Sequence, residues 1–484
     1  MNYFKLFIFF LLTSIIINAQ NQIGENIEVS DDFFSWASSV SVSSDGSRIA
    51  VGGYGKSDFG FRVYEFNNSD WVQIGNDIPT DYPNEVSLYK VSLSSQGNRI
   101  AVGAVINTLP NDLGHVKIYD FDGVNWIQIG STLIGESNSD FFGSRILLSS
   151  NGNRLVVGAK FNNNSFGNAR VFEFNGSDWI QMGNDIDPDG VNEPIYFGTS
   201  VSISPDGNRV AVGANQYYDE DLEVRGLVRT YDFDGINWVQ VGNDLNGENL
   251  QDSGFGVGLS FTNNADRIAI GSIASEGYVK VFEFSNSNWE QIGETILSNE
   301  IGSRFGFAIV LFDEGNRIAI GAPYNSQNGN SAGMVRLFEL SNSVWHQLGE
   351  DIVGDNFDDN LGESLSISMD GMTLATGALD YIYDQSGTES GYAKVFDITN
   401  LVLDLKDDNF ENYVVYPNPA TESIQFINAL EIKEFFIYDS YGRLVISEEF
   451  QNQKIDISHF QTGIYYITLI NNDNIPKSLK IIKK

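Results

Sequence analysis

The stretch Ser202-Ile-Ser-Pro-Asp-Gly-Asn-Arg-Val-Ala-Val-Gly-Ala214 decides the fold, because related segments recur along the chain. The related segments share a run before the turn, a tight turn, and an apolar segment that ends in a glycine. A period of this length indicates a solenoid, a propeller or an array of small units. The glycine occurs seven times, 50 to 58 residues apart, at Gly52, Gly103, Gly158, Gly213, Gly271, Gly321 and Gly377.

Two more segments complete each repeat. The first alternates apolar and polar residues, as in Val63–Phe66. A complete repeat therefore contains four short strands. Strand A is the run before the turn, B is the apolar segment that ends in the glycine, C is the alternating segment, and D is the Trp-x-Gln-x-Gly segment. Four strands in about 50 residues are typical of a propeller blade. The sequence predicts an all-β protein with a seven-bladed β-propeller over residues 20–398. The second segment, Trp-x-Gln-x-Gly, follows in six repeats and begins at Trp71, Trp126, Trp179, Trp238, Trp289 and Trp345.

The seventh repeat lacks its Trp-x-Gln-x-Gly strand. A matching piece, Gln22–Ile27 (QIGENI), lies near the start of the chain. We expect this N-terminal strand to close the last blade, residues 361–398, as its outer strand, because a closed ring leaves no free sheet edge there. An open-ended solenoid is the alternative, but it gives the N-terminal segment no role.

The turns predict two different faces. Asp-Gly pairs such as Asp206-Gly207 and Asp234-Gly235 mark tight A–B and C–D turns, where Gly takes a positive φ. The B–C and D–A loops are longer and variable, as in residues 215–226 and 379–391. We expect a binding site on this long-loop face or at its centre.

The N-terminus predicts export. Lys5 is the only charge in residues 1–19, an apolar run covers Leu6 to Leu12, and the small residue Ala19 ends the segment. This is the pattern of a secretory signal peptide, and a retained anchor is the alternative. No other apolar run is long enough to cross a membrane, so we expect no transmembrane segment after cleavage.

The C-terminal part, residues 414–484, follows a linker over residues 399–413 and differs from the repeats. Short alternating segments separated by glycines predict a small β-sandwich. Its motifs are a PNP opening, a YDxxGR turn, a GIYYI strand and a basic end. Their marker residues are Pro417, Asn418, Pro419, Gly442, Gly463, Lys483 and Lys484.

These motifs, in this order and spacing, closely resemble the type A C-terminal sorting domain of the type IX secretion system of Bacteroidota. The resemblance implies Sec export, passage across the outer membrane, the type IX machinery as a partner, and a secreted or outer-surface location. An accessory sandwich domain is the alternative.

The repeats resemble FG-GAP repeats, known from integrin α-chain propellers and bacterial surface proteins. Phe305-Gly306 followed by Gly321-Ala322-Pro323 gives the full pattern once, and Trp36-Ala37 replaces FG in the first repeat. The A–B turns hold one acid at most, which argues against the calcium loops of that family.

Charge and composition exclude several functions. The net charge of −36 argues against nucleic-acid binding and against docking on anionic lipids. Residues 20–398 carry 52 acidic and 19 basic side chains, so a cation or basic partner is expected on the long-loop face. The absence of Cys removes disulfides, thiolate nucleophiles and Cys-ligated metals.

One acidic run is a candidate calcium site. Asp185, Asp187 and Asp189 precede Gly190 with the spacing of a calcium loop, although Tyr196 stands where such a loop carries Glu. A solvated acidic loop is the alternative. No other cofactor is expected.

Two aromatic-acidic loops are candidate ligand-binding loops. They could contact an extracellular glycan or protein, because aromatic rings beside carboxylates suit sugar rings. Solvated, blade-specific insertions are the alternative. The candidate residues are Tyr217, Tyr218, Asp219 and Asp221 in one loop and Tyr381, Tyr383 and Asp384 in the other.

Catalysis is not expected. His115, His346 and His459 lie in different units with no acid–nucleophile pattern around them. The favoured function is a secreted or surface-attached binding and adhesion module. The alternatives are a polymer-degrading hydrolytic propeller and a calcium-stabilised scaffold. We interpret the recurring Trp residues as packing between blades, and the recurring Arg at the start of strand B as bonded to loop carbonyls or acids.

Overall fold

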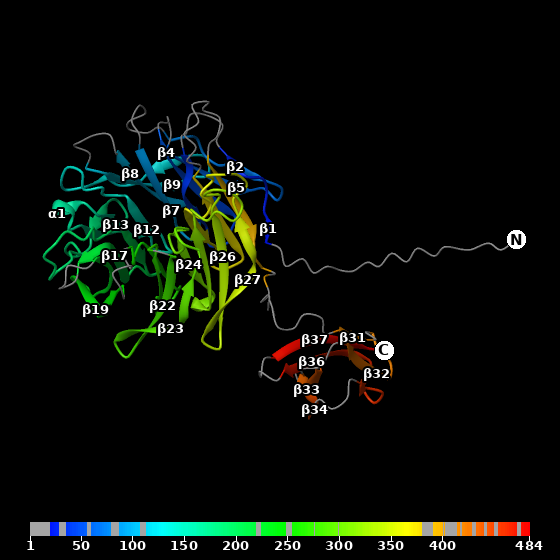
Figure 1. Cartoon of the computed structure of the whole chain (residues 1–484). Helices are drawn as coiled ribbons and strands as arrows, with labels where there is room; N and C mark the ends of the chain where they lie inside the picture. Colours follow the sequence, from blue (N-terminus) through cyan, green and yellow to red (C-terminus); the bar gives the residue numbers. More distant parts are fainter. Residues whose placement is uncertain are drawn as a thin grey trace. The chain divides into compact units, whose positions relative to one another are not determined.

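The chain divides into two compact units, residues 1–404 and residues 405–484. The computed structural model (Figure 1) describes residues 20–28, 35–55, 60–78, 87–106, 113–218, 224–247, 254–274, 276–298, 300–379, 391–399, 401, 414–416, 419–427, 432–439, 443–449, 454–471 and 476–484. The expected signal peptide and nearly all of the expected linker lie outside these residues. In the described part, no helix is long and apolar enough to span a membrane.

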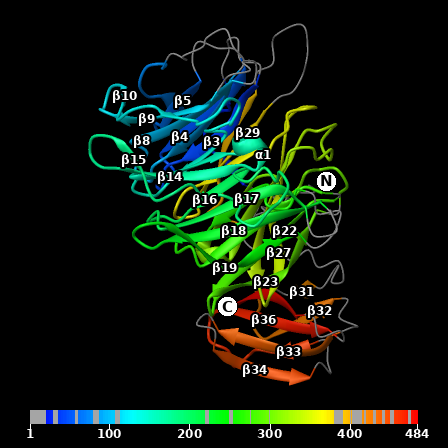
Figure 2. The ribbon, with the colours of Figure 1, turned by 90° about the vertical axis from the view of Figure 1, so that its left-hand side faces the viewer.

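The first unit consists of antiparallel repeats that follow one another in chain order (Figures 1 and 2). Each repeat has four strands of its own except the last, which has three, and the first two repeats are joined in one sheet. We number the repeats 1 to 7 and name their strands A to D. The strands of repeats 1 to 3 are β3 (Ser35–Val42), β4 (Arg48–Gly55), β5 (Phe61–Phe66), β6 (Trp71–Gln73); β7 (Ser87–Leu93), β8 (Arg99–Ile106), β9 (His115–Phe121), β10 (Trp126–Gln128); β12 (Arg145–Leu148), β13 (Arg154–Ala159), β14 (Asn168–Phe174) and β15 (Trp179–Gln181).

Repeats 4 to 7 continue the pattern. Their strands are β16 (Ser200–Ile203), β17 (Arg209–Tyr218), β18 (Val224–Phe233), β19 (Trp238–Asn246); β20 (Gly258–Phe261), β21 (Arg267–Ser272), β22 (Tyr278–Ser285), β23 (Asn288–Leu297); β24 (Ile309–Phe312), β25 (Arg317–Ala322), β26 (Met334–Ser341), β27 (Val344–Val353); β28 (Ser364–Ile367), β29 (Thr373–Ala378) and β30 (Tyr392–Asp397). The short elements α1 (Asn162–Ser165), η1 (Asp313–Gly315) and β11 (Leu133–Ile134) lie between them.

Strand D differs in length between repeats. In repeats 1 to 3 it is three residues long, whereas β19, β23 and β27 run for nine or ten residues. The longer strands pass the motif glycine through a register shift, which is a β-bulge that keeps the later residues paired.

The A strands form the inner ring. Each contacts the A strand of the next repeat, and β28 contacts β3, so the order is cyclic. Serines in these strands bridge the neighbours: Leu148 N donates to Ser92 Oγ at 2.9 Å, and Leu311 N donates to Ser260 Oγ at 2.9 Å. The Ser-rich A strands therefore supply acceptors for backbone N–H groups that no sheet partner satisfies.

The A–B turns also bond to one another around the ring. Ser44 N donates to Ser95 O, and Met369 N donates to Ser44 O at 3.0 Å, which joins repeat 7 to repeat 1. The Asp-Gly glycines of these turns have positive φ, for example +74° at Gly207, as the sequence predicts.

The N-terminal segment closes the last repeat as predicted. It forms two short strands, β1 (Asn21–Gln22) and β2 (Ile27–Glu28), and both pair with β30. Gly24, with φ +71°, separates them and lies where a Cβ would touch the Trp71 ring at 2.9 Å. Trp71 Nε1 donates to Ile23 O at 2.8 Å. The Trp of repeat 1 thus packs on this borrowed strand, just as Trp126 packs on Gly75.

The recurring strand-B glycines have a steric cause. A Cβ on Gly158 would collide with the carbonyl of Gly198, which belongs to the Phe-Gly pair of the next repeat. Gly103 meets Gly143 in the same way, and Gly377 meets Ala37. The Trp36-Ala37 pair therefore fills the Phe-Gly position of repeat 1.

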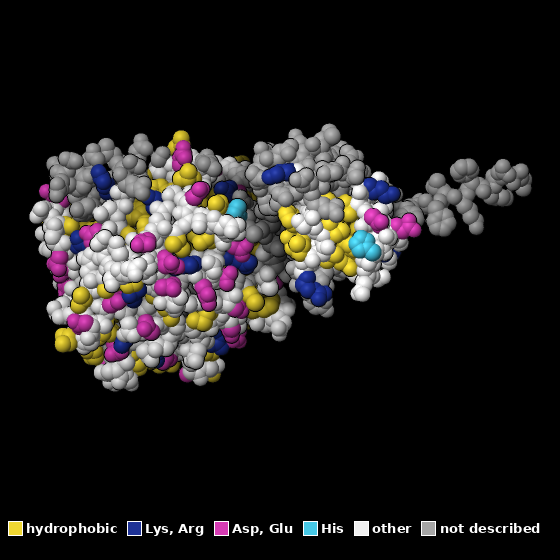
Figure 3. Space-filling view, turned by 90° about the horizontal axis from the view of Figure 1, so that it is seen from below, with side chains coloured by type: hydrophobic (Ala, Val, Ile, Leu, Met, Phe, Trp, Pro, Cys, Tyr) yellow, Lys and Arg dark blue, Asp and Glu magenta, His cyan; other side chains and the backbone are white. Residues whose placement is uncertain are grey.

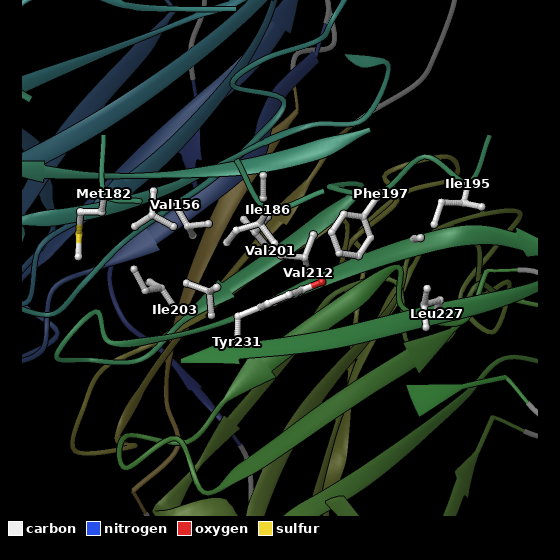
Figure 4. Close-up of a cluster of buried hydrophobic side chains, with 14 residues drawn as sticks. Val156, Met182, Ile186, Ile195, Phe197, Val201, Ile203, Val212, Leu227 and Tyr231 are labelled. Carbon is white, nitrogen blue, oxygen red and sulfur yellow. The ribbon is translucent and has the colours of Figure 1, made fainter. Parts of the chain in front are cut away.

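The core lies between neighbouring repeats. Figure 4 shows one such cluster, in which Val156 of repeat 3 packs with Val201, Val212 and Tyr231 of repeat 4. Phe197, fully buried, belongs to the same cluster. Because each cluster spans two repeats, no repeat buries its apolar surface alone.

The second unit is a small sandwich of two antiparallel sheets, as predicted. A core of Ile424, Ile437, Ile467 and similar side chains lies between them. One sheet has the order β31 (Val414–Tyr416), β32 (Ser423–Ile427), β35 (Lys454–Asp456), and the other has the order β34 (Leu444–Glu449), β33 (Ile432–Asp439), β36 (Gly463–Asn471), β37 (Pro476–Lys483).

Candidate functional site

Five charged side chains from the A strands and the long loops lie near enough to interact electrostatically. We call Lys90, Arg145, Lys160, Arg304 and Glu363 the central cluster. Lys90 and Arg145 lie on β7 and β12, Lys160 follows β13, Arg304 lies in the loop before β24, and Glu363 immediately precedes β28. All five are partly exposed, so solvent and ligands can reach them.

Two of these residues occupy one repeated position. Lys90 pairs in register with Gly103, and Arg145 pairs with Gly158. In other repeats the residue opposite the strand-B glycine is small: Ser39, Ser200, Gly258 and Ser364. A repeat position that is small elsewhere and basic only in repeats 2 and 3 is not explained by packing.

The surroundings shift the pKa values of the two lysines, of Arg145 and of Glu363. Burial, aided by the charge of Arg145, lowers the pKa of Lys90 to about 7, although Glu363 opposes this shift. Burial and Arg145 together lower the pKa of Lys160 to about 8. Burial raises the pKa of Glu363, although the charges of Lys90, Arg145 and Arg304 oppose this. The site therefore disfavours its own charges when no ligand is bound.

The residue before each Phe-Gly pair adopts a left-handed backbone. φ is +59° at Phe141, +59° at Tyr196 and +55° at Arg304. The equivalent Asn360 has φ +54°. Large side chains in this region cost about 1–2 kcal/mol each, and such strain clusters at functional sites. These side chains differ from repeat to repeat, whereas the Phe-Gly scaffold beneath them recurs.

Three aromatic rings form a row beside this position. The Phe141 and Phe161 rings lie edge-on with centroids 4.6 Å apart, and the Phe161 and Tyr196 centroids are 5.5 Å apart. Lys160 Nζ lies 5.0 Å from the centroid of the Phe161 ring. Across the repeats, the Arg304 guanidinium lies 4.1 Å from the centroid of the Tyr324 ring. The rings are partly exposed, so the row offers apolar faces next to cations.

The candidate calcium residues are not brought together as a metal site. Asp185 accepts hydrogen bonds from Gln181 Nε2 at 2.8 Å and Asn168 Nδ2 at 3.0 Å, while Asp187 and Asp189 are exposed. Among the described residues, no group of three or more acidic or His side chains could hold a metal ion. Burial, together with the charges of Asp185 and Asp189, raises the pKa of Asp187. Calcium here stays a prediction.

The Gln–Asp contact at Asp185 belongs to strand D rather than to a metal loop. Gln73 bonds to Asp77, Gln347 bonds to Asp351, and Gln22 of the closing strand bonds to Asn26. Repeated contacts of this kind indicate a structural role for Asp185.

The structure does not describe the side chains of the candidate residues in the two binding loops. Tyr217 and Tyr218 form the end of β17, but their side chains lie outside the described part of the chain. Asp219, Asp221, Tyr381, Tyr383 and Asp384 also lie outside the described residues. Their role in binding stays a prediction.

The recurring Arg and Trp residues have the roles expected of them. Arg209 Nε bonds to Asp232 Oδ1 at 2.6 Å, and its Nη1 reaches Ala265 O of the next repeat at 3.0 Å. Trp238 Nε1 donates to Met182 O of the preceding repeat at 2.9 Å. Both residue types hold neighbouring repeats together.

A shallow groove lies between the outer strands β23 and β27. It is lined by Gln291, Gly293 and Val344, among others. Gln291 and Gly293 belong to the Trp-x-Gln-x-Gly motif, so the groove is a by-product of the repeat.

The sandwich brings its distant sorting motifs together. Ala420, next to the exposed Pro419, donates through its N–H to Ile482 O at 2.8 Å, and Lys484 N donates to Ala420 O at 2.9 Å. Gly463 pairs with Lys483, whose side chain is 7% exposed. Pro417, Asn418 and Gly442 lie outside the described residues.

Surface character differs between the two units. In Figure 3, Asp and Glu side chains are scattered over the visible face of the repeats. The sandwich shows a gathering of hydrophobic side chains in the same view. Its exposed apolar residues include Leu444, Val445 and Tyr466.

Solved structures with similar shape are distant. Hydrazine synthase of Kuenenia stuttgartiensis is 12% identical with a TM-score of 0.48, and the match covers 72% of this chain and 94% of that one. A Bacteroides uniformis protein named as a 6-phosphogluconolactonase is 11% identical with a TM-score of 0.45, covering 66% and 86%. The propeller assignment rests on the strand pairing above.

Sequence comparison identifies the C-terminal unit. No curated protein matches the chain. The family model described as the secretion system C-terminal sorting domain matches residues 414–484, the range predicted for that domain. Residues 414–484 therefore form a type IX secretion sorting domain, which marks the protein as secreted or displayed on the outer cell surface.

Proposed function

We propose that this protein is an exported binding and adhesion module that holds an extracellular ligand over the central cluster. The sorting domain supports the extracellular location. The observation that carries the binding role is the set of unit-specific side chains on repeated scaffold positions, such as Arg145 opposite Gly158 and Tyr196 before Phe197. Variable side chains on a rigid repeat are the usual way in which such folds acquire a ligand.

The described chemistry favours binding over hydrolysis. Paired-acid glycoside hydrolysis needs two carboxyl groups on either side of the scissile bond. The described members of the central cluster are four cations and the single carboxylate of Glu363. This set can orient a ligand, but it does not provide the acid pair.

The proposal is tested with glycan and protein arrays probed by the purified full chain. We expect binding that the Tyr196→Ala variant loses and that the Ile236→Ala variant keeps, because Ile236 is 77% exposed on a C–D turn. Hits that survive unchanged in Tyr196→Ala would place the ligand elsewhere and contradict the proposal.

A further inference from the structure

The cations of the central cluster differ from most arginines of the described repeats. Ten arginines of the described repeats have a carboxylate oxygen within 4.0 Å. Lys90, Arg145, Lys160 and Arg304 have no such partner among the described residues. In a chain with 64 acidic and 28 basic side chains, carboxylates are plentiful, so this gathering of unmatched cations is unexpected.

The hydrogen-bonding capacity of these cations is largely unused. Lys90 Nζ donates to Ser38 O at 2.7 Å, and Arg145 Nη1 donates to Ser144 O at 3.0 Å. A guanidinium has five N–H donors, and an ammonium has three. Lys160 and Arg304 rest against aromatic rings, which support the charge but accept no conventional hydrogen bond. Donors therefore remain available for an incoming acceptor.

We infer that the central cluster binds the carboxylate of an acidic sugar residue within a glycan. This inference rests on the proposed function and names the ligand class of the same site. Arg145 and Arg304 supply the planar donors that suit a carboxylate, and Lys90 supplies a point charge. The row formed by Phe141, Phe161 and Tyr196 offers an apolar surface for the sugar ring beside that carboxylate.

The charge of the remaining surface favours a glycan with sparse acidic groups over a dense polyanion. The net charge of residues 20–398 is strongly negative, so a nucleic acid or a heavily charged polymer is repelled at long range. A single carboxylate among neutral sugars is attracted by the four nearby cations more strongly than it is repelled by the distant acidic side chains, because salt screens the distant charges. Glu363 can accept a hydrogen bond from a neighbouring sugar hydroxyl.

The test is calorimetric titration of the full chain at pH 6 with oligosaccharides that contain glucuronate and with their neutral glucose counterparts. We expect the acidic probe to bind at least tenfold more tightly than the neutral one. We expect Arg145→Gln to lower the affinity at least tenfold. The matched control is Arg62→Gln. It removes an arginine of strand C that is ion-paired to Asp77, and it should leave the affinity unchanged.

A folding defect in Arg145→Gln is covered by a second variant. Lys160→Gln changes a loop residue outside the strands and should lower affinity several-fold while the melting temperature stays the same. Equal binding of acidic and neutral probes, or wild-type affinity in both variants, overturns the inference. Binding of an acidic peptide in place of the uronate probe also overturns it. If array binding still depends on Tyr196 in those cases, the proposed function stands without its acidic ligand.

Discussion

The closing strand gives the sharpest prediction about stability. Ile27 of β2 is 4% exposed and packs in a cluster that joins repeats 7 and 1, with Trp71, Ile49 and Ala393. Truncating a buried Ile to Ala costs about 3 kcal/mol, within the range of 2–5 kcal/mol for such changes. We therefore expect Ile27→Ala to destabilise the whole ring by that amount, although the strand has only two residues.

The expected change in melting temperature follows from the size of the unit. Unfolding entropy is about 2.1 cal/mol/K per residue, which over residues 20–398 gives roughly 0.8 kcal/mol/K. A loss of about 3 kcal/mol then lowers Tm by about 4 °C. The assay is thermal unfolding of the full chain followed by circular dichroism at two protein concentrations.

The matched control is Ile236→Ala, the same truncation at a side chain that is 77% exposed. It should change stability by less than about 0.5 kcal/mol. Gly24→Ala is a second probe, because φ is +71° and the added Cβ meets the Trp71 ring. If the melting temperatures of Ile27→Ala and Gly24→Ala equal that of Ile236→Ala, the N-terminal segment does not hold the ring closed, and the reasoning is refuted.

Four further predictions follow from other contacts. Gly158→Ala should cost about 3 kcal/mol in chemical denaturation, because its Cβ meets the Gly198 carbonyl, whereas Gly123→Ala, with open space around it, should cost about 1–2 kcal/mol; equal costs would argue against the steric explanation. Trp289→Phe should cost about 1 kcal/mol more than Trp179→Phe, because Trp289 Nε1 donates to Thr230 Oγ1 at 2.8 Å while Trp179 Nε1 has no partner in the described part; thermal melts compare them. The hydrogen bonds from Arg62 lower the pKa of Asp77, so this carboxylate contributes stability above its ordinary pKa of 3.8 that is lost as pH falls; the Tm difference between wild type and Asp77→Asn should shrink from pH 7 to pH 3, and a constant difference would contradict this. Lys90, whose pKa is about 7, and Lys160, whose pKa is about 8, both lose their charge between pH 6 and pH 9, so affinity for the glucuronate probe should fall several-fold over that range, and Lys90→Gln should make the fall smaller while the part due to Lys160 remains.

Much of the fold was predictable because the same sequence motifs recur in each repeat, so that a missing motif shows where another segment must take its place. The seventh repeat lacked a Trp-x-Gln-x-Gly segment, and Gln22–Ile27 supplied one, so the pairing with β30 followed from the pattern. The sequence also showed the recurring strand-B glycines. It did not show the reason for them, which is close contact with the carbonyl of the Phe-Gly pair in the next repeat.

The central cluster was not predicted, because its members come from different places in the repeat. Arg145 lies on an A strand, Lys160 follows a B strand, and Arg304 lies in a D–A loop. Only closure of the ring brings them together. One signal was available: Lys90 and Arg145 stand where other repeats carry small residues. From the net charge we expected a cation or a basic partner to bind the long-loop face, whereas the central cluster consists of four cations and one carboxylate.

The borrowed strand also has a consequence for the order in which the protein can fold. Ile27 is synthesised 366 residues before its partner Ala393. At 5–20 residues per second, this separation corresponds to roughly 20–70 s during which the two edges exist apart. Pairings of such long range form slowly, and each edge can meanwhile pair with another chain. The contact that makes the finished ring continuous is therefore also the step at which its assembly is most vulnerable.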